Sequence, residues 1–181
     1  MEYGQINFIK KYFRGIFMVT IRKAIEHDVE EITKIYNEAI LKTVATFDTK
    51  PKTIEEQITW FKNHGSKNPI LVAVENKNVI GWAALSIWSD RCAYSDTAEI
   101  SLYVYKKHQK KGVGRKLLEE AIKEGQKAGI HTVIARITEG NESSVHLHES
   151  VGFFNIGIMR EVGFKFNKRL DVYIMQKIYP D

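Results

Sequence analysis

The sequence predicts one α/β domain, in which helices flank a single mixed sheet. Two observations carry this prediction. Short runs of alternating or continuous apolar residues, typical of strands, are interspersed with stretches whose apolar residues repeat every three or four positions, typical of helices. Their order is strand, helix, helix, three strands, helix, strand, helix and two strands, without internal repeats or a linker. Elements mixed in this way pack as layers on the faces of one sheet.

Composition narrows the possible function classes. The chain has 181 residues, 44% of them hydrophobic, and a net charge of +5, which suits an anionic ligand. No interleaved aromatic and basic surface motif predicts nucleic-acid binding, and the apolar runs are too short to span a membrane. The single cysteine, Cys92, and six scattered histidines predict neither a disulfide nor a metal site. Such cysteine usage favours a reducing, cytoplasmic compartment.

The first seventeen residues differ from the rest of the chain. They mix phenylalanine and isoleucine with basic residues, and Met18 opens a stretch that resembles an ordinary protein start. We expect residues 1–17 to be an extension, either disordered or produced by an upstream start site, and residues 18–181 to form the domain. An amphipathic surface helix is the alternative for this segment.

Each element has its own signal in the first half of the chain. Polar residues flank Ile21 in a strand over 19–24, and a stripe of apolar residues predicts a helix over 28–41. Pro51 places 43–52 in a loop, after which Thr53 and Glu56 match a capping box for a helix over 54–64. Strands over 70–75 and 79–88 form a hairpin around 76–78, and 88–96 is turn-like.

The second half continues with a strand around Glu99 and a helix over 115–128 that ends at Gly129. A strand over 131–138 and a short helix over 141–151 follow, with Asn141 as its N-cap. Two closing strands, over 153–162 and 170–177, are expected to flank a turn at 163–169.

A basic glycine loop, Gln109-Lys-Lys-Gly-Val-Gly114, joins the strand around Glu99 to the next helix. Free backbone N–H groups and the helix dipole favour an anion at such a helix N-terminus. A P-loop is excluded, because no Lys-Ser/Thr follows and Gly112 and Gly114 are too close. A dinucleotide fingerprint is excluded, because Leu117 stands where the third glycine is required.

The remaining pattern, Gln-x-x-Gly-x-Gly after a strand that carries a glutamate, resembles the GNAT superfamily of N-acetyltransferases. The resemblance implies the GNAT acyl-CoA N-acyltransferase fold, with a central twisted mixed sheet flanked by helices. It also implies that the loop binds the pyrophosphate of acetyl-CoA. A plain strand-to-helix connection, with glycines for tight turning, is the alternative.

A second motif narrows the resemblance. Many superfamily members carry Leu-Tyr-x-x-x-Gly-Phe, with the tyrosine as general acid, and this chain has Leu147-His-Glu-Ser-Val-Gly-Phe153. With His148 in the tyrosine's place, the chain is similar to the phosphinothricin acetyltransferase-like branch. Further matches to that branch are Tyr36-Asn37, Thr46-Phe47, Trp88, Arg91, Ala93-Tyr94, Glu99, Tyr103-Val104, His108-Gln109 and Leu147-His148-Glu149. That branch acetylates the α-amino group of small amino-acid analogues such as phosphinothricin, methionine sulfoximine and methionine sulfone. Relatives are commonly homodimers.

The resemblance implies a role for each candidate site residue. Glu99 is the candidate general base, acting through water, and His148 either protonates or orients the leaving thiolate or shares the base role. The backbone of Leu102, Tyr103 and Val104 is expected to hold pantetheine and polarise the thioester carbonyl. The residues expected to bind the pyrophosphate are those of the glycine loop: Gln109, Lys110, Lys111, Gly112, Val113 and Gly114. Asn141 is expected to bind the CoA arm or only to cap its helix.

The substrate pocket and its alternatives remain expectations. Phe47 would form an apolar wall, Arg91 would pair with a carboxylate, and Trp88 and Tyr94 would line the rim. Asp90 stands where relatives often carry a basic or small residue. The resemblance therefore does not define the complete set of residues that bind the substrate carboxylate. A protein or peptide N-acetyltransferase and a non-catalytic acyl-CoA-binding module are the competing functions.

Overall fold

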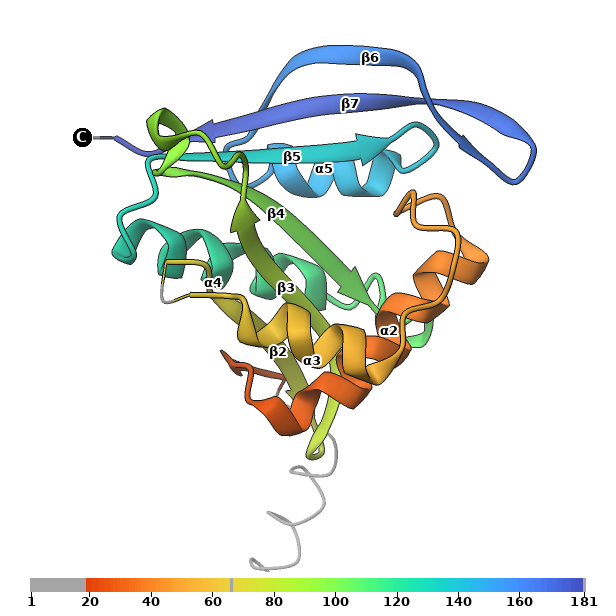
Figure 1. Cartoon of the computed structure of the whole chain (residues 1–181), viewed down its shortest axis with the longest axis vertical. Coiled ribbons are helices and arrows are strands. Elements are labelled where there is room, and N and C mark those ends of the chain that lie inside the picture. The colour runs from red at the N-terminus through yellow and green to blue at the C-terminus, as the bar shows by residue number, and fades with distance from the viewer. Residues whose placement is uncertain (1–18, 66, 181) are drawn as a thin grey trace, which may run out of the picture.

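A computed structural model describes residues 19–65 and 67–180, and its strands and helices follow the predicted order (Figure 1). The strands are β1 (Thr20–Lys23), β2 (Ile70–Glu75), β3 (Asn78–Ile87), β4 (Thr97–Val104), β5 (Thr132–Thr138), β6 (Phe154–Lys165) and β7 (Lys168–Ile178). The helices are α2 (Val29–Lys42), α3 (Ile54–Lys62), α4 (Val113–Lys127) and α5 (Glu142–Glu149). The expected extension, 1–17, lies outside the described residues.

Within the described chain the strands form one sheet, in the order β1-β2-β3-β4-β5-β7-β6. Neighbouring strands are antiparallel except β4 and β5, which run parallel and pair only from Thr97 with Thr132 to Glu99 with Ile134. Beyond Glu99 the two strands diverge, and Figure 1 shows the gap widening to the right. The second half of β4 therefore has an open edge.

Helices cover both faces of the sheet around β2 and β3. Leu117 and Leu118 of α4 pack with Leu71 and Leu85, all almost fully buried, on one face. On the other face lies a second cluster, in which Ile32 and Ile35 of α2 pack with Val72, Trp82 and Ala84 of the sheet, and α3 packs against it through Trp60 and Phe61. Burial on both faces explains why β2 and β3 read as continuous apolar runs. None of the helices in the described part of the chain is both long and apolar enough to cross a membrane.

The capping box predicted for α3 is confirmed, because Thr53 Oγ1 accepts from Glu56 N–H and Glu56 Oε2 accepts from Thr53 N–H. Gly129, at φ +82°, ends α4 as predicted. The start of α4 differs from the prediction: the helix begins at Val113, directly after Gly112 in the left-handed conformation at φ +79°. Val113 is buried, so the core fixes the helix two residues earlier than expected.

The turn predicted at 163–169 is wrong in its extent. β6 runs on to Lys165, and the turn consists of Phe166 and Asn167, whose φ angles are 51° and 59°. Gly163 lies within the strand, where the Phe47 ring occupies the space that a Cβ would need. This glycine serves packing rather than a turn.

Candidate active site

A cleft of about 450 Å³ opens where β4 and β5 part. Of the predicted site residues, it brings together Phe47, Glu99, Leu102, Tyr103, Asn141 and His148. Polar residues that the sequence analysis gave no role in the site also line it, among them Asp48, Ser101, Arg136 and Ser144. The cleft thus combines aromatic walls with a small set of polar groups, as small-molecule sites commonly do.

His148 lies on the face of α5 that lines the cleft, and only 4% of it is exposed. Its Nδ1 lies 2.8 Å from the carbonyl oxygen of Ser144. A carbonyl can only accept, so this partner assigns the hydrogen to Nδ1 and leaves the lone pair on Nε2. Burial lowers the pKa of His148, although the bond to Ser144 opposes this shift. A neutral imidazole in this tautomer can accept a proton at Nε2 but cannot donate one there.

Glu99 is held by an arginine at the point where the strands separate. Arg136 Nε donates to Glu99 Oε1 at 2.6 Å, and Nη2 donates to Oε2 at 2.7 Å. The Trp88 ring lies 6.0 Å from Arg136 Cζ, within range of a cation–π contact. The hydrogen bonds to Glu99 raise the pKa of Arg136, against the effect of its own burial. The pair is a fixed, oriented dipole in the cleft wall.

The open edge of β4 presents backbone groups on alternate residues. Tyr105 N–H donates to Ile80 O of β3, so Tyr103 also directs its backbone groups toward β3. Leu102 and Val104 direct theirs toward the open side, where Gln109 Nε2 donates to Val104 O at 2.9 Å. The expectation that the Tyr103 amide faces the cofactor is therefore wrong, because the β3 ladder uses it. Tyr103 lines the cleft instead.

The glycine loop and the start of α4 form a potential anion site. Gly112 adopts φ +79° and Lys110 φ +59°, and the Lys110 and Lys111 side chains are exposed. The N–H groups of Gly112, Val113 and Gly114 have no hydrogen-bond partner among the described residues. Such groups, aligned with the helix dipole, suit a phosphate.

Asn141 precedes α5 and lines the cleft, but its side chain makes no capping hydrogen bond. Its Oδ1 accepts only from Ser143 Oγ, at 3.3 Å. The predicted capping interaction is therefore absent, because Asn141 has φ −114° and ψ 51° rather than the extended geometry usual for an N-cap. The side-chain amide remains available to a ligand.

The loop 43–52 closes one side of the cleft. Tyr36 O–H donates to Asp48 Oδ2 at 2.8 Å, and burial raises the pKa of Tyr36 to about 12, so it stays protonated. Lys165 Nζ donates to Thr46 O at 2.7 Å, which ties the loop to the end of β6. Phe47 lies between these anchors, against Gly163, and lines the cleft.

Comparison with known proteins decides the family. A family model described as the acetyltransferase (GNAT) domain matches residues 21–174, most of the chain. The chain belongs to the GNAT acetyltransferase family. The predicted fold is thereby confirmed, and so is the enzyme class, an N-acyltransferase.

Similar GNAT proteins include two bacterial enzymes and a crystal structure. The chain is 38% identical over 159 residues to the L-amino acid N-acyltransferase MnaT of Escherichia coli, covering 87% of this chain and 92% of that protein. It is 38% identical to the L-methionine sulfoximine/L-methionine sulfone acetyltransferase of Salmonella typhimurium, covering 87% and 93%. It superposes on a GNAT superfamily phosphinothricin acetyltransferase from Sinorhizobium meliloti, in complex with acetyl-CoA, with a TM-score of 0.86, 34% identity and 88% coverage of both chains.

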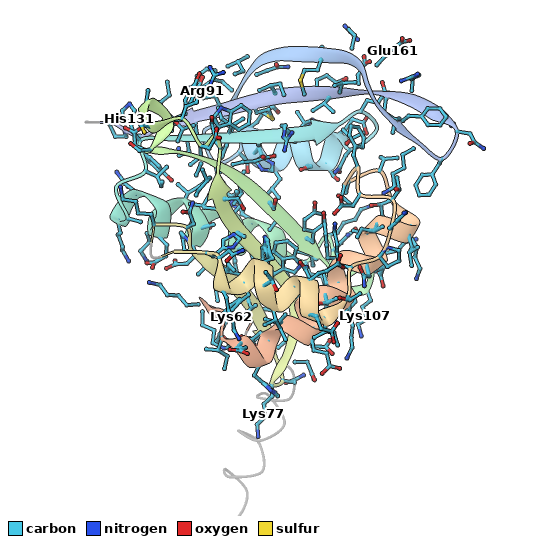
Figure 2. The ribbon with its side chains drawn as sticks, viewed as in Figure 1. Lys62, Lys77, Arg91, Lys107, His131 and Glu161 are labelled. Carbon is cyan, nitrogen blue, oxygen red and sulfur yellow. The ribbon has the colours of Figure 1, made fainter. Side chains whose placement is uncertain are left out.

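Three residues expected at the GNAT substrate pocket do not line the cleft. Trp88, Arg91 and Tyr94 lie in or beside the connection from β3 to β4, near the end where β4 and β5 are still paired. Arg91 and Tyr94 are exposed, and Figure 2 shows Arg91 at the upper left, where β4 begins. Trp88 contributes indirectly, through its ring beside Arg136.

Sequence reasoning missed Arg136 as a residue of this cleft in the GNAT fold. A signal for it exists: Arg136 is the only charged residue in the otherwise apolar or small strand Thr132–Thr138. A charge in such a strand needs a partner, and Glu99 supplies it. Within 19–65 and 67–180, no three His, Cys, Asp or Glu side chains group closely enough to hold a metal ion.

Proposed function

We propose that this GNAT enzyme uses acetyl-CoA to acetylate the α-amino group of a small amino-acid analogue. Phosphinothricin, methionine sulfoximine and methionine sulfone are the candidate substrates, and the acetyl group passes by direct transfer. The observation that carries the proposal is one cleft that holds the buried His148 together with the Glu99–Arg136 pair. The named activities of the Escherichia coli and Salmonella relatives support the substrate class.

Acetyl-CoA supplies the acetyl group as a thioester, and several features of the chain fit it. The open edge of β4 offers the N–H groups of Leu102 and Val104 to pantetheine and to the thioester carbonyl. The free N–H groups at the start of α4, with Gly112 in the left-handed conformation, fit the pyrophosphate. Asn141, whose side chain does not cap α5, is assigned to the CoA arm.

The amine must lose a proton before its nitrogen can attack a carbonyl carbon. We assign this proton to His148 Nε2, directly or through a water molecule. Three properties support the assignment: the ring lines the cleft, Nδ1 is tied to Ser144, and burial keeps the imidazole neutral at neutral pH. The same tautomer argues against His148 as the acid that protonates the thiolate.

Glu99 is assigned to hold the α-ammonium group before its deprotonation. Each carboxylate oxygen accepts one N–H from Arg136 and keeps a further lone pair for a second donor. A role for Glu99 as the base itself, through water, is the alternative within the same function. Phe47, which also lines the cleft, would contact the apolar part of the substrate side chain.

An acetyl-transfer assay tests the function. Thiol release from acetyl-CoA is measured with methionine sulfone, methionine sulfoximine, phosphinothricin and a set of peptides. The proposal predicts turnover with at least one amino-acid analogue and little with peptides. Turnover with peptides alone would establish the competing protein N-acetyltransferase function. Tight acetyl-CoA binding without turnover of any amine would favour a binding module.

We also propose that two copies of the chain associate through the edge strand β6. Six of its apolar side chains are exposed: Phe154, Ile156, Ile158, Met159, Val162 and Phe164. An edge strand of this character is a ready surface for a second chain. Sedimentation equilibrium should give a dimer, and Ile158→Glu should shift it toward monomer. A monomer at micromolar concentration in the unaltered protein would rule the association out.

A further inference from the structure

The cleft has one strong positive charge. Among the described residues that line it, Arg136 is the only arginine or lysine. Two carboxylates, Glu99 and Asp48, line it as well, and His148 is neutral. An α-amino acid carries one negative and one positive group, so its carboxylate has few possible partners here.

The guanidinium of Arg136 is only partly used by the protein. Nε and one N–H of Nη2 bind Glu99, which leaves the second Nη2 N–H and both N–H groups of Nη1. Nη1 has no hydrogen-bond partner among the described residues, and the side chain is 51% exposed. The contact with the Trp88 ring and the bond to Glu99 restrict the guanidinium from two sides. One edge of a fixed, planar donor is therefore left free.

We infer that the Glu99–Arg136 pair recognises the α-amino acid zwitterion as a unit, with Arg136 as the carboxylate-binding residue. The free guanidinium edge binds the α-carboxylate, and the outer lone pairs of Glu99 accept from the α-ammonium group. Because the two residues are fixed side by side, the two charges of the substrate meet complementary groups without rearrangement of the cleft. This inference rests on the proposed function, and it assigns to Arg136 the clamp that the sequence analysis gave to Arg91.

The positions of the two arginines support this choice. Arg136 lines the cleft with Glu99, whereas Arg91 is exposed in the connection before β4 and does not line it.

The test compares two substrates that differ only at the carboxylate. Values of kcat/KM are measured for methionine sulfone and for its carboxamide, with the full chain and with the variants Arg136→Gln, Arg136→Lys and Arg91→Gln. A loss of Glu99 orientation affects both substrates equally, so the ratio of acid to amide isolates the carboxylate contact. Thermal unfolding midpoints identify any variant that is merely unstable.

Arg136→Gln should lower kcat/KM for the acid by roughly 10- to 100-fold, mainly through KM, as expected for a lost charge-assisted bond. The acid-to-amide ratio should fall by the same factor. Arg136→Lys keeps the positive charge but lacks the planar guanidinium that could bind Glu99 and the substrate carboxylate together. It should therefore lower kcat/KM for the acid by a smaller factor than Arg136→Gln. Arg91→Gln should leave the ratio unchanged.

Two outcomes would overturn the inference. An equal loss on acid and amide in Arg136→Gln would show that the arginine acts only through Glu99. An acid-specific loss in Arg91→Gln would return the clamp to that residue. Either result leaves the proposed function intact, whereas failure of the unaltered chain to acetylate any amino acid would remove the function itself.

Discussion

Replacing Gly163 with alanine should disturb both the stability of the protein and its cleft. A Cβ at this position would lie 2.8 Å from Phe47 Cδ2, and closer still to the far end of the ring. Ordinary contact begins at 3.4 Å, so Cδ2 alone would require the ring to move by about 0.6 Å, and the nearer carbons Cε2 and Cζ require a larger displacement. Overpacking of this kind costs about 1–3 kcal/mol. The ring is 36% exposed and can swing outward, so we expect about 1 kcal/mol of lost stability together with a higher KM for the amino-acid substrate.

The same strand offers a matched control, because a Cβ at Gly157 would have no heavy atom within 4 Å. Urea unfolding and acetyl-transfer kinetics are measured for Gly163→Ala and Gly157→Ala, and for Gly163→Ala combined with Phe47→Ala. Gly157→Ala should change stability by less than about 0.5 kcal/mol. Adding Gly163→Ala to Phe47→Ala should cost nothing further. If Gly163→Ala matched Gly157→Ala in both stability and KM, the packing account of Gly163 would be refuted.

Three further predictions concern the cofactor loop, the core and the ion pair. Gly112→Val places a β-branched residue at φ +79° and should weaken acetyl-CoA binding roughly tenfold by calorimetry, whereas Gly129→Val, at φ +82° beyond the other end of α4, should lower stability without changing that affinity. Gly125→Ala brings a Cβ within 2.5 Å of Leu85 Cδ1 and should cost about 1–3 kcal/mol in urea unfolding; an unchanged midpoint would contradict the close α4–β3 packing. Glu99→Gln removes the carboxylate assigned to hold the α-ammonium group and should lower kcat/KM at neutral pH by roughly 100-fold while the acetyl-CoA affinity stays within about twofold, and an unaltered kcat/KM would remove that role from Glu99.

Much of the fold could be predicted because its signals are local. The continuous apolar runs of β2 and β3, the helical stripe of α2 and the capping box at Thr53 each depend on neighbours in sequence. The glycine loop that we propose for the pyrophosphate was recognisable for the same reason. The structural role of a glycine could not be predicted from its neighbours alone. Gly129 ends a helix, whereas Gly163 makes room for the Phe47 ring, which is distant in sequence.

The site was harder to predict, because it depends on where two strands separate. Nothing local to Glu99 indicates that Arg136, on the neighbouring parallel strand, holds both of its oxygens. The connection with Arg91 and Tyr94 was expected at the substrate because these residues match the phosphinothricin acetyltransferase-like branch. Pairing of β4 with β5 at that end leaves it outside the cleft.

The role of His148 is the central claim about the chemistry. Burial disfavours the imidazolium, so the pKa of His148 lies below the ordinary value of about 6.5 and the ring remains a competent base at neutral and mildly acidic pH. The part of the acetylation rate that depends on His148 should therefore decline as pH falls through that lowered pKa. The imidazole becomes protonated there and can accept no further proton.

The most direct test is the pH profile of kcat/KM for the unaltered chain and for His148→Gln, with Glu99→Gln measured in parallel. Dividing the profile of each variant by that of the unaltered chain cancels the ionisation of the substrate amine. We predict that His148→Gln loses the acidic decline below pH 6.5 and is slower at neutral pH by roughly 10²- to 10⁴-fold. Retention of that decline in His148→Gln, with its loss in Glu99→Gln, would contradict the account and make Glu99 the base.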